Sequence, residues 1–396
     1  MEISLNMFLT TAIAVVVYYM GMAIKNRVAF LQKYCIPAPV VGGILFAVGI
    51  LILHETGLLI VHMDTTLQQA FMLVFFCSIG FNARMKVLKK GGIQLVFIVI
   101  LIAILCTIQN FMSAGIVSAM GQHPLLGVAI GSVPMVGGHG TAAAFGPLIE
   151  EMGVGSAATA SYAAATYGLI AGCMIGGPIA RARIMQLKKK EIGAAIAGEE
   201  ESFINEKPKN ILSGEKIMLA VGLLLLCVGF GTIISDIIGK LMTFSAAVGS
   251  LLAGCILRNV CDAKNIELPD EEIEITGDVS LSVFLSMAMM SMELWLLADL
   301  ALPMIITLLA ETVVTGLFAY TVVFWVMGRD YDAAVMAAGT CGFGLGATPN
   351  AIANMNAVTS KFGPAARAFL VIPIAGSMFA DVVNSTIITL FMNLFG

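Results

Sequence analysis

The feature that most constrains this sequence is a series of long apolar segments, each close to the length that crosses a lipid bilayer. A helix needs about 20 mainly apolar residues to span the hydrocarbon core. Such segments recur along the whole chain, which is 59% hydrophobic and only 12% charged. With a mean hydropathy of +0.96, the chain cannot present a polar surface to water on all sides. The sequence therefore predicts an all-α polytopic membrane protein with ten transmembrane helices.

The predicted spans form two groups of five, separated by the one long polar stretch. The first group covers residues 3–24, 39–55, 68–81, 93–117 and 157–180. The second covers residues 217–238, 243–257, 279–297, 300–327 and 365–394. We therefore expect an N-terminal repeat over residues 1–185, a hydrophilic linker over 186–215 and a C-terminal repeat over 216–396. Because each group has an odd number of spans, the two repeats should lie in opposite orientations.

Between the fourth and fifth span of each group lies an uncharged segment that glycine and proline interrupt, at residues 125–148 and 333–355. The repeated glycines argue against an ordinary helix. Unwound backbone in a membrane is tolerated where protein buries it or where it lines a water-filled cavity. Two such breaks at matching positions indicate a transporter's binding site; the alternative is two flexible loops outside the membrane. The candidate residues are Gly137, Gly138, His139, Gly140 and Thr141, then Cys341, Gly342, Gly344, Gly346, Thr348 and Pro349.

Lysine and arginine indicate the orientation, because cytoplasmic loops of membrane proteins carry an excess of both. If the N-terminus lies outside, all of the 21 Lys and Arg residues except Lys240 fall in cytoplasmic segments. Both termini are then outside, the linker is cytoplasmic, and the location is the cell (inner) membrane. Each interrupted segment must also enter and leave on one side. We therefore expect two re-entrant loops that approach the membrane centre from opposite faces.

The residue types in the two loops suit an anion together with a small cation. Glycine lets the backbone come close to a ligand, and the first amides of a helix can bind a carboxylate. Sodium binds carbonyl and hydroxyl oxygens. Besides the backbone, the loops offer such oxygens on Thr141, Thr348, Asn350 and Asn354. His139 has no carboxylate near it in the sequence, so we expect it to order the loop or to lie beside the substrate, not to act as a catalyst.

Four polar residues inside the spans are further candidates. Asp381 and Asn384 share one face of the last span, and an acid within a membrane is a functional site by default. Asp381 would bind sodium together with Thr141, Thr348 and Asn354, or it would be a structural carboxylate. Asn82 ends the third span, where it would cap the helix or coordinate a ligand. Glu311 lies in mid-span and would be either protonated and packed or part of a proton or cation path.

Other classes of protein fit poorly. The net charge of −4 gives no reason to expect a nucleic-acid partner. The eight cysteines lack metal-binding spacing, and an intramembrane enzyme would need a nucleophile–base pair or a metal cluster that the sequence does not offer. We therefore expect no enzyme activity and no cofactor besides a coupling ion. A sodium/proton antiporter with Glu311 and Asp381 as carriers would lack adjacent intramembrane acids and would leave both neutral loops unexplained.

The two interrupted segments resemble those of the sodium/glutamate symporter family. The resemblance rests on GGHGT at 137–141 and CGFGLGATP at 341–349. It continues at residues 36–37, 41–43, 82, 176–178, 279–282, 331–335 and 381–384. It implies sodium-coupled uptake of L-glutamate, a ten-span inverted repeat, an elevator-like movement and a homodimer in the lipid bilayer. The chain departs from the family pattern at Val136, Glu311 and Thr340, so a transporter of another small carboxylate is the alternative.

Overall fold

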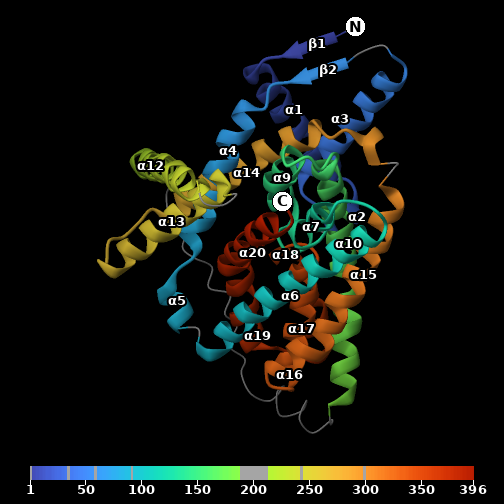
Figure 1. Ribbon diagram of the computed structural model, residues 1–396. Helices are drawn as coiled ribbons and strands as arrows, with labels where there is room; N and C mark the ends of the chain where they lie inside the picture. Colours follow the sequence, from blue (N-terminus) through green and yellow to red (C-terminus); the bar gives the residue numbers. More distant parts are fainter. Residues whose placement is uncertain are drawn as a thin grey trace.

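The computed structural model describes residues 2–33, 36–57, 60–90, 92–187, 213–240, 244–297 and 300–396. The predicted linker therefore lies almost entirely outside the described residues. The described chain is helical apart from two short strands, β1 (Glu2–Leu5) and β2 (Ile60–Met63), which pair in parallel. This small sheet was not predicted, and it lies at the end of the molecule that holds the N-terminus (Figure 1).

The first half of the chain contains a succession of helices that ends in one long helix. They are α1 (Met7–Lys25), α2 (Ala29–Lys33), α3 (Ala38–Glu55), α4 (Thr66–Asn82), α5 (Met85–Lys90), α6 (Gly92–Ala119), α7 (Pro124–Ile130), α8 (Ser132–Met135), α9 (Gly138–Glu151) and α10 (Ala157–Gln186). Local capping fixes several starts: the side chain of Asn6 accepts hydrogen bonds from the amides of Phe8 and Leu9 at α1.

The second half is likewise a succession of helices. It contains α12 (Gly214–Gly239), α13 (Ala246–Ala263), α14 (Asp270–Met290), the 3-10 helix η1 (Leu294–Leu297), α15 (Ala301–Phe318), η2 (Ala319–Val323), α16 (Phe324–Val326), α17 (Tyr331–Gly344), α18 (Thr348–Phe362), α19 (Ala366–Ile374), η3 (Ala375–Ala380) and α20 (Asp381–Phe395). Two π-helical turns, η2 and η3, interrupt the ninth and tenth spans, which the sequence predicts as continuous.

Among the described residues, ten helices are long and apolar enough to cross a membrane, as predicted. The main difference concerns the eighth span, which begins at Asp270 instead of residue 279 and ends at Met290 instead of residue 297. Its first turn holds Asp270, Glu271 and Glu272. Carboxylates at a helix N-terminus interact favourably with the helix dipole, so an acidic stretch can begin a helix and need not be a loop.

The helices pack as two groups, each drawing on both halves of the chain. One contains α1, α3 and α4 from the first half with α12, α13 and α14 from the second. The other contains α6 to α10 with α15 to α20. Leu225, Leu226 and Phe230 leave an apolar face of α12 uncovered, as contact with lipid requires. In Figure 1, α12 and α13 project sideways from the group that contains α6 to α10 and α15 to α20.

The two interrupted segments are helical hairpins with short breaks. The first breaks at residues 136–137 between α8 and α9, and the second at residues 345–347 between α17 and α18. The expectation that the glycine runs are unwound was wrong for most of their length, because Cys341, Gly342 and Gly344 lie within α17. Helical pairing satisfies their backbone groups, which would be costly to leave unpaired in a buried segment.

Candidate functional site

A cavity of about 290 Å³ lies between the breaks of the two hairpins. The first hairpin contributes residues 137–141, the second contributes Gly346, Ala347, Pro349 and Asn350, and the tenth span contributes Asp381. Apolar side chains of α4, α10 and α14 close the cavity: Phe75, Ile79, Leu169, Leu281 and Leu285. Segments about 200 residues apart in the sequence therefore meet at one small space with an acid at its edge.

The two breaks contact each other directly at Gly138 and Gly346. Gly138 has φ +61°, a conformation that glycine adopts without strain. A Cβ atom on Gly138 would lie 2.9 Å from the carbonyl oxygen of Gly346, too close for any other residue. The glycines in this motif therefore allow the start of α9 and the break of the second hairpin to meet.

Helix N-termini face this cavity from both hairpins. Helix α9 begins at Gly138 and α18 begins at Thr348, and the cavity is lined by Gly138, His139 and Gly140 of α9 and by Pro349 and Asn350 of α18. The first amides of a helix have no carbonyl partner within the helix, and the helix dipole gives this end a partial positive charge. The start of α9 therefore offers hydrogen-bond donors suited to a carboxylate group, in a lining that contains no Lys or Arg.

His139 is held by α10 at the edge of the cavity. Its Nε2 atom lies 3.0 Å from Oγ1 of Thr166, and the Thr166 hydroxyl is 3.1 Å from the carbonyl oxygen of Tyr162. A hydroxyl has one proton to donate. If Thr166 donates it to Tyr162, then Nε2 of His139 donates to Thr166 and a neutral ring leaves Nδ1 as an acceptor. Among the residues that the structure describes, no group of three His, Cys, Asp or Glu is placed to hold a metal ion.

Helix α10 also positions the second hairpin through a stripe of small residues. Gly168, Gly172 and Gly176 share one face of α10 and let the α17–α18 backbone approach closely. Nδ2 of Asn350 donates to the carbonyl of Leu169 at 3.1 Å, and Nδ2 of Asn354 donates to that of Gly172 at 2.8 Å. Asn350 also lines the cavity, and its Oδ1 atom is buried and has no hydrogen-bond partner among the described residues.

Asp381 and Asn384 lie one turn apart at the start of α20. Asp381 lines the cavity. Asn384 donates through Nδ2 to the carbonyl of Ser132 at 2.8 Å, next to a further break at Gly131 that the sequence did not reveal. The amide of Ser132 in turn donates to Oδ1 of Asn110 at 2.9 Å. Asn384 therefore supports the first hairpin from the opposite half of the chain.

Comparison with known proteins identifies the family of this chain. The family model for sodium/glutamate symporters matches residues 3–364. This chain belongs to the sodium/glutamate symporter family. Proteins named sodium/glutamate symporter from Escherichia coli (strain K12) and Shigella flexneri are each 38% identical over 396 residues, covering 98% of both chains. One from Haemophilus influenzae is 36% identical over 393 residues, covering 98% of this chain and 97% of its own.

Several residues singled out in the sequence of this sodium/glutamate symporter family member lie away from the cavity. Cys341, Gly342 and Gly344 are buried within α17, where a Cβ on Gly342 would lie 2.4 Å from the Cα of Ala351 in α18. Thr348 packs against Gly376 of η3, and Asn82 is exposed at the end of α4. The sequence did not single out the aromatic and leucine side chains of α4 and α14 as cavity-lining residues. Apolar residues of this kind are equally expected wherever two spans pack together.

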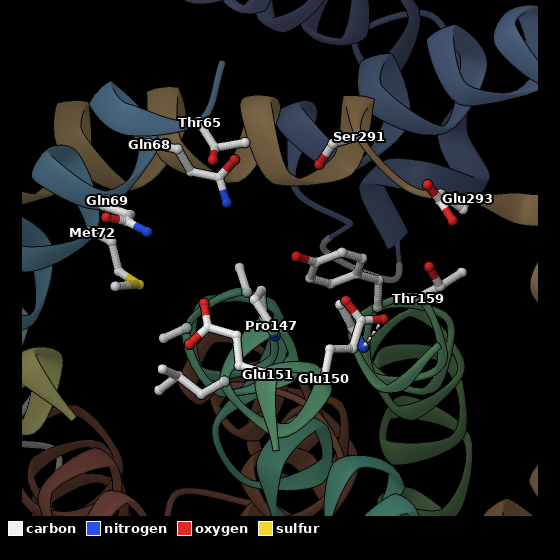
Figure 2. Close-up of a pocket in the computed structure, with 15 residues that line it drawn as sticks. Thr65, Gln68, Gln69, Met72, Pro147, Glu150, Glu151, Thr159, Ser291 and Glu293 are labelled. Carbon is white, nitrogen blue, oxygen red and sulfur yellow. Dashed lines mark hydrogen bonds between the residues drawn. The ribbon is translucent and has the colours of Figure 1, made fainter. Parts of the chain in front are cut away.

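A second cavity, of about 300 Å³, has a different character (Figure 2). Glu150 and Glu151 reach it from α9, and Glu293 reaches it from the segment after α14. Burial raises the pKa of Glu150, and the charge of Glu293 adds to this effect. The lining contains three carboxylates and no Lys or Arg, so it repels anions. The first cavity is therefore the candidate site for an anionic substrate.

Proposed function

We propose that this protein imports L-glutamate by symport with sodium, and that both bind in the cavity between the two hairpin breaks. The observation that carries this proposal is the convergence of both breaks and Asp381 on one cavity, in a chain of the sodium/glutamate symporter family. Relatives that match nearly the full chain are named for this activity. The alternative of another small carboxylate would use the same site chemistry.

The substrate carboxylates would bind the first amides of α9, because in α18 Pro349 has no N–H and the amide of Asn350 already donates to the carbonyl of Ala347 at 3.0 Å. Helix N-termini provide both hydrogen-bond donors and partial positive charge. The ring of His139 would accept a hydrogen bond from the substrate's ammonium group through Nδ1, because its Nε2 is engaged by Thr166. The apolar side chains of Phe75, Leu281 and Leu285 would cover the aliphatic part of glutamate.

Sodium would bind oxygens on the other side of the same cavity. Asp381 offers a carboxylate, Thr141 a hydroxyl and Asn350 the unpaired Oδ1. Thr348 and Asn354, which the sequence also suggested as ligands, would instead support the second hairpin, because Thr348 packs on η3 and Asn354 donates to Gly172. Neutralising the charge of Asp381 would then couple sodium to substrate binding, since a bare carboxylate beside an anion is unfavourable.

An inverted repeat with opposed re-entrant hairpins accounts for the packing. The last span of each half packs on the hairpin of the other half: α10 on α17 and α18, and α20 on α7 and α8. The basic residues favour outer termini, a cytoplasmic linker and an inner-membrane location. The group α6 to α10 with α15 to α20 would move as the transport domain of an elevator. The group with α12 to α14 would form the fixed part and the homodimer contact.

The test is glutamate uptake into proteoliposomes under an inward sodium gradient. We expect uptake to require sodium, and Asp381→Asn to weaken the apparent sodium affinity while the protein still inserts and unfolds at the wild-type temperature. Asp236→Asn is the matched control, because Asp236 is an exposed acid in α12, and it should leave sodium dependence unchanged. Uptake that persists when choline replaces sodium, driven instead by a proton gradient, would refute sodium symport.

A further inference from the structure

Glu311 is a fully buried acid in the middle of α15 and belongs to neither cavity. It is the only charged residue in this helix. Both of its carboxylate oxygens lack a hydrogen-bond partner among the described residues. Moving an ionised carboxylate into such surroundings without a partner costs so much that the group takes up a proton instead. Packing alone does not require an acid at this position, so the presence of a buried carboxyl group calls for a functional explanation.

No opposite charge is placed to stabilise an ionised Glu311. The helices packed on α15 are α6, α7, α10 and α17, followed by η2. Their titratable side chains are Cys106 of α6, Tyr162, Tyr167, Cys173, Arg181 and Arg183 of α10, Tyr320 of η2, and Tyr331, Asp332 and Cys341 of α17. Arg181 is exposed, and Arg183 donates to the carbonyl of Tyr320 at 2.8 Å, more than two turns past Glu311. The buried neighbours are therefore thiols and phenols, not cations.

The surroundings of Glu311 also connect it to the candidate site. Thr315 lies one turn from Glu311 on the same face of α15. Nε2 of Gln109 donates both to Oγ1 of Thr315 at 3.1 Å and to the carbonyl of Gly344 at 2.9 Å, where the second hairpin breaks. A charge that appears on Glu311 would therefore act close to the second break, through the turn of α15 that Gln109 joins to it.

We propose that Glu311 is a proton-binding site of the transport cycle, which takes up one proton when the site is closed and releases it when water reaches α15. This inference rests on the proposed transport function. Sodium suits the position less well, because α15 is a regular α-helix around Glu311 and its carbonyls are already paired. Side-chain hydroxyls of Thr307 and Thr315 would be the nearest additional oxygens on that face, too few for a hard cation that prefers several oxygens.

The experiment measures sodium-driven glutamate uptake between pH 5.5 and 8.5, with an entrapped pH dye reporting proton movement. We expect the wild-type rate to change with pH, with a limiting slope of about tenfold per pH unit for one proton, and protons to move with substrate. Glu311→Gln should remove both effects and keep sodium dependence. Asp236→Asn, at an exposed acid of α12, should retain the wild-type pH profile.

Wild-type protein provides a second test in case Glu311→Gln does not fold. A hydrophobic carbodiimide reacts with protonated buried carboxyl groups, so mass spectrometry should find Glu311 modified at low pH and progressively less at high pH. Modification that is equal at every pH, or absent, would overturn the proposal. So would an unchanged pH profile in Glu311→Gln, or a shifted sodium requirement with the pH profile intact. Absence of any sodium-driven uptake would instead contradict the proposed function, which the carbodiimide test does not depend on.

Discussion

The contact between α10 and the second hairpin can be tested by adding a single methyl group at Gly168. A Cβ at this position would lie 2.1 Å from the carbonyl oxygen of Leu345, whereas real Cβ atoms essentially never come within 3.0 Å of another heavy atom. Both partners are backbone, so neither can rotate away. Helix α10 and the hairpin break would have to separate by about 1 Å, since that is the difference between the two distances.

This separation would affect two hydrogen bonds on the same face. The bonds from Asn350 to Leu169 and from Asn354 to Gly172, at 3.1 and 2.8 Å, would lengthen beyond useful geometry. Polar contacts of this kind contribute about 0.6–1.7 kcal/mol each in membrane proteins, and overpacking costs about 1–3 kcal/mol. Alanine recovers roughly 1 kcal/mol of helix propensity. We therefore expect Gly168→Ala to destabilise the protein by about 2–4 kcal/mol.

The assay compares Gly168→Ala with Gly177→Ala in purified protein and in proteoliposomes. Gly177 lies on the same helix, and a Cβ there would meet nothing within 4 Å. We expect Gly168→Ala to lower the Tm by several degrees and to abolish most sodium-driven uptake. Gly177→Ala should leave both quantities at or slightly above wild type. Equal behaviour of the two variants would refute the reasoning, because only the close backbone contact distinguishes them.

Two further predictions concern the acidic cavity and the orientation of the hairpins. Burial, with a smaller contribution from Glu293, raises the pKa of Glu150. The unfolded chain therefore releases this proton at a lower pH than the folded protein does. Between the unfolded and the folded pKa, the native state loses stability as the pH rises. The Tm of Glu150→Gln should therefore exceed that of the wild type increasingly as the pH rises above the usual pKa of a glutamate, and should differ little below that pH. Glu151→Gln, at an exposed neighbour, should show no such trend. Glu151 and Ser360 are exposed at the open ends of the two hairpins, and each can be replaced by a single cysteine. A membrane-impermeant thiol reagent should label Glu151→Cys in right-side-out vesicles and Ser360→Cys in inside-out vesicles. Labelling of both from one side would contradict the inverted repeat.

The spans could be predicted from the sequence because a membrane imposes a length and a composition on every helix. Hydropathy alone located all ten, and the acidic start of α14 was missed because its first turns carry charge. The sequence singled out several residues that line the candidate cavity for a related reason. Glycine, proline and an acid are costly inside an apolar segment, so 137–141, 346–350 and Asp381 stood out from their surroundings.

The local conformation at the glycines could not be predicted in the same way. Glycine permits a break, but it equally permits two helices to touch, and the sequence pattern is the same. Gly138 is required by its positive φ and its contact with Gly346, whereas Gly342 remains helical and allows α18 to approach α17. Deciding between these roles needs the partner backbone, which lies far away in the sequence. The break at Gly131 and the π-helical turns were missed because they depend on the same tertiary contacts.

One turn of α10 connects the two hairpins and would let their breaks act as one site. Thr166 binds His139 of the first hairpin, and the carbonyl of Leu169 accepts the side-chain amide of Asn350 in the second. Gly168, between them, contacts the break itself at Leu345. A ligand that shifts either hairpin therefore pulls on the same turn of helix. Because both hairpins are hydrogen-bonded to this one turn, we predict that a ligand bound at one break changes the affinity of the other break for its own ligand.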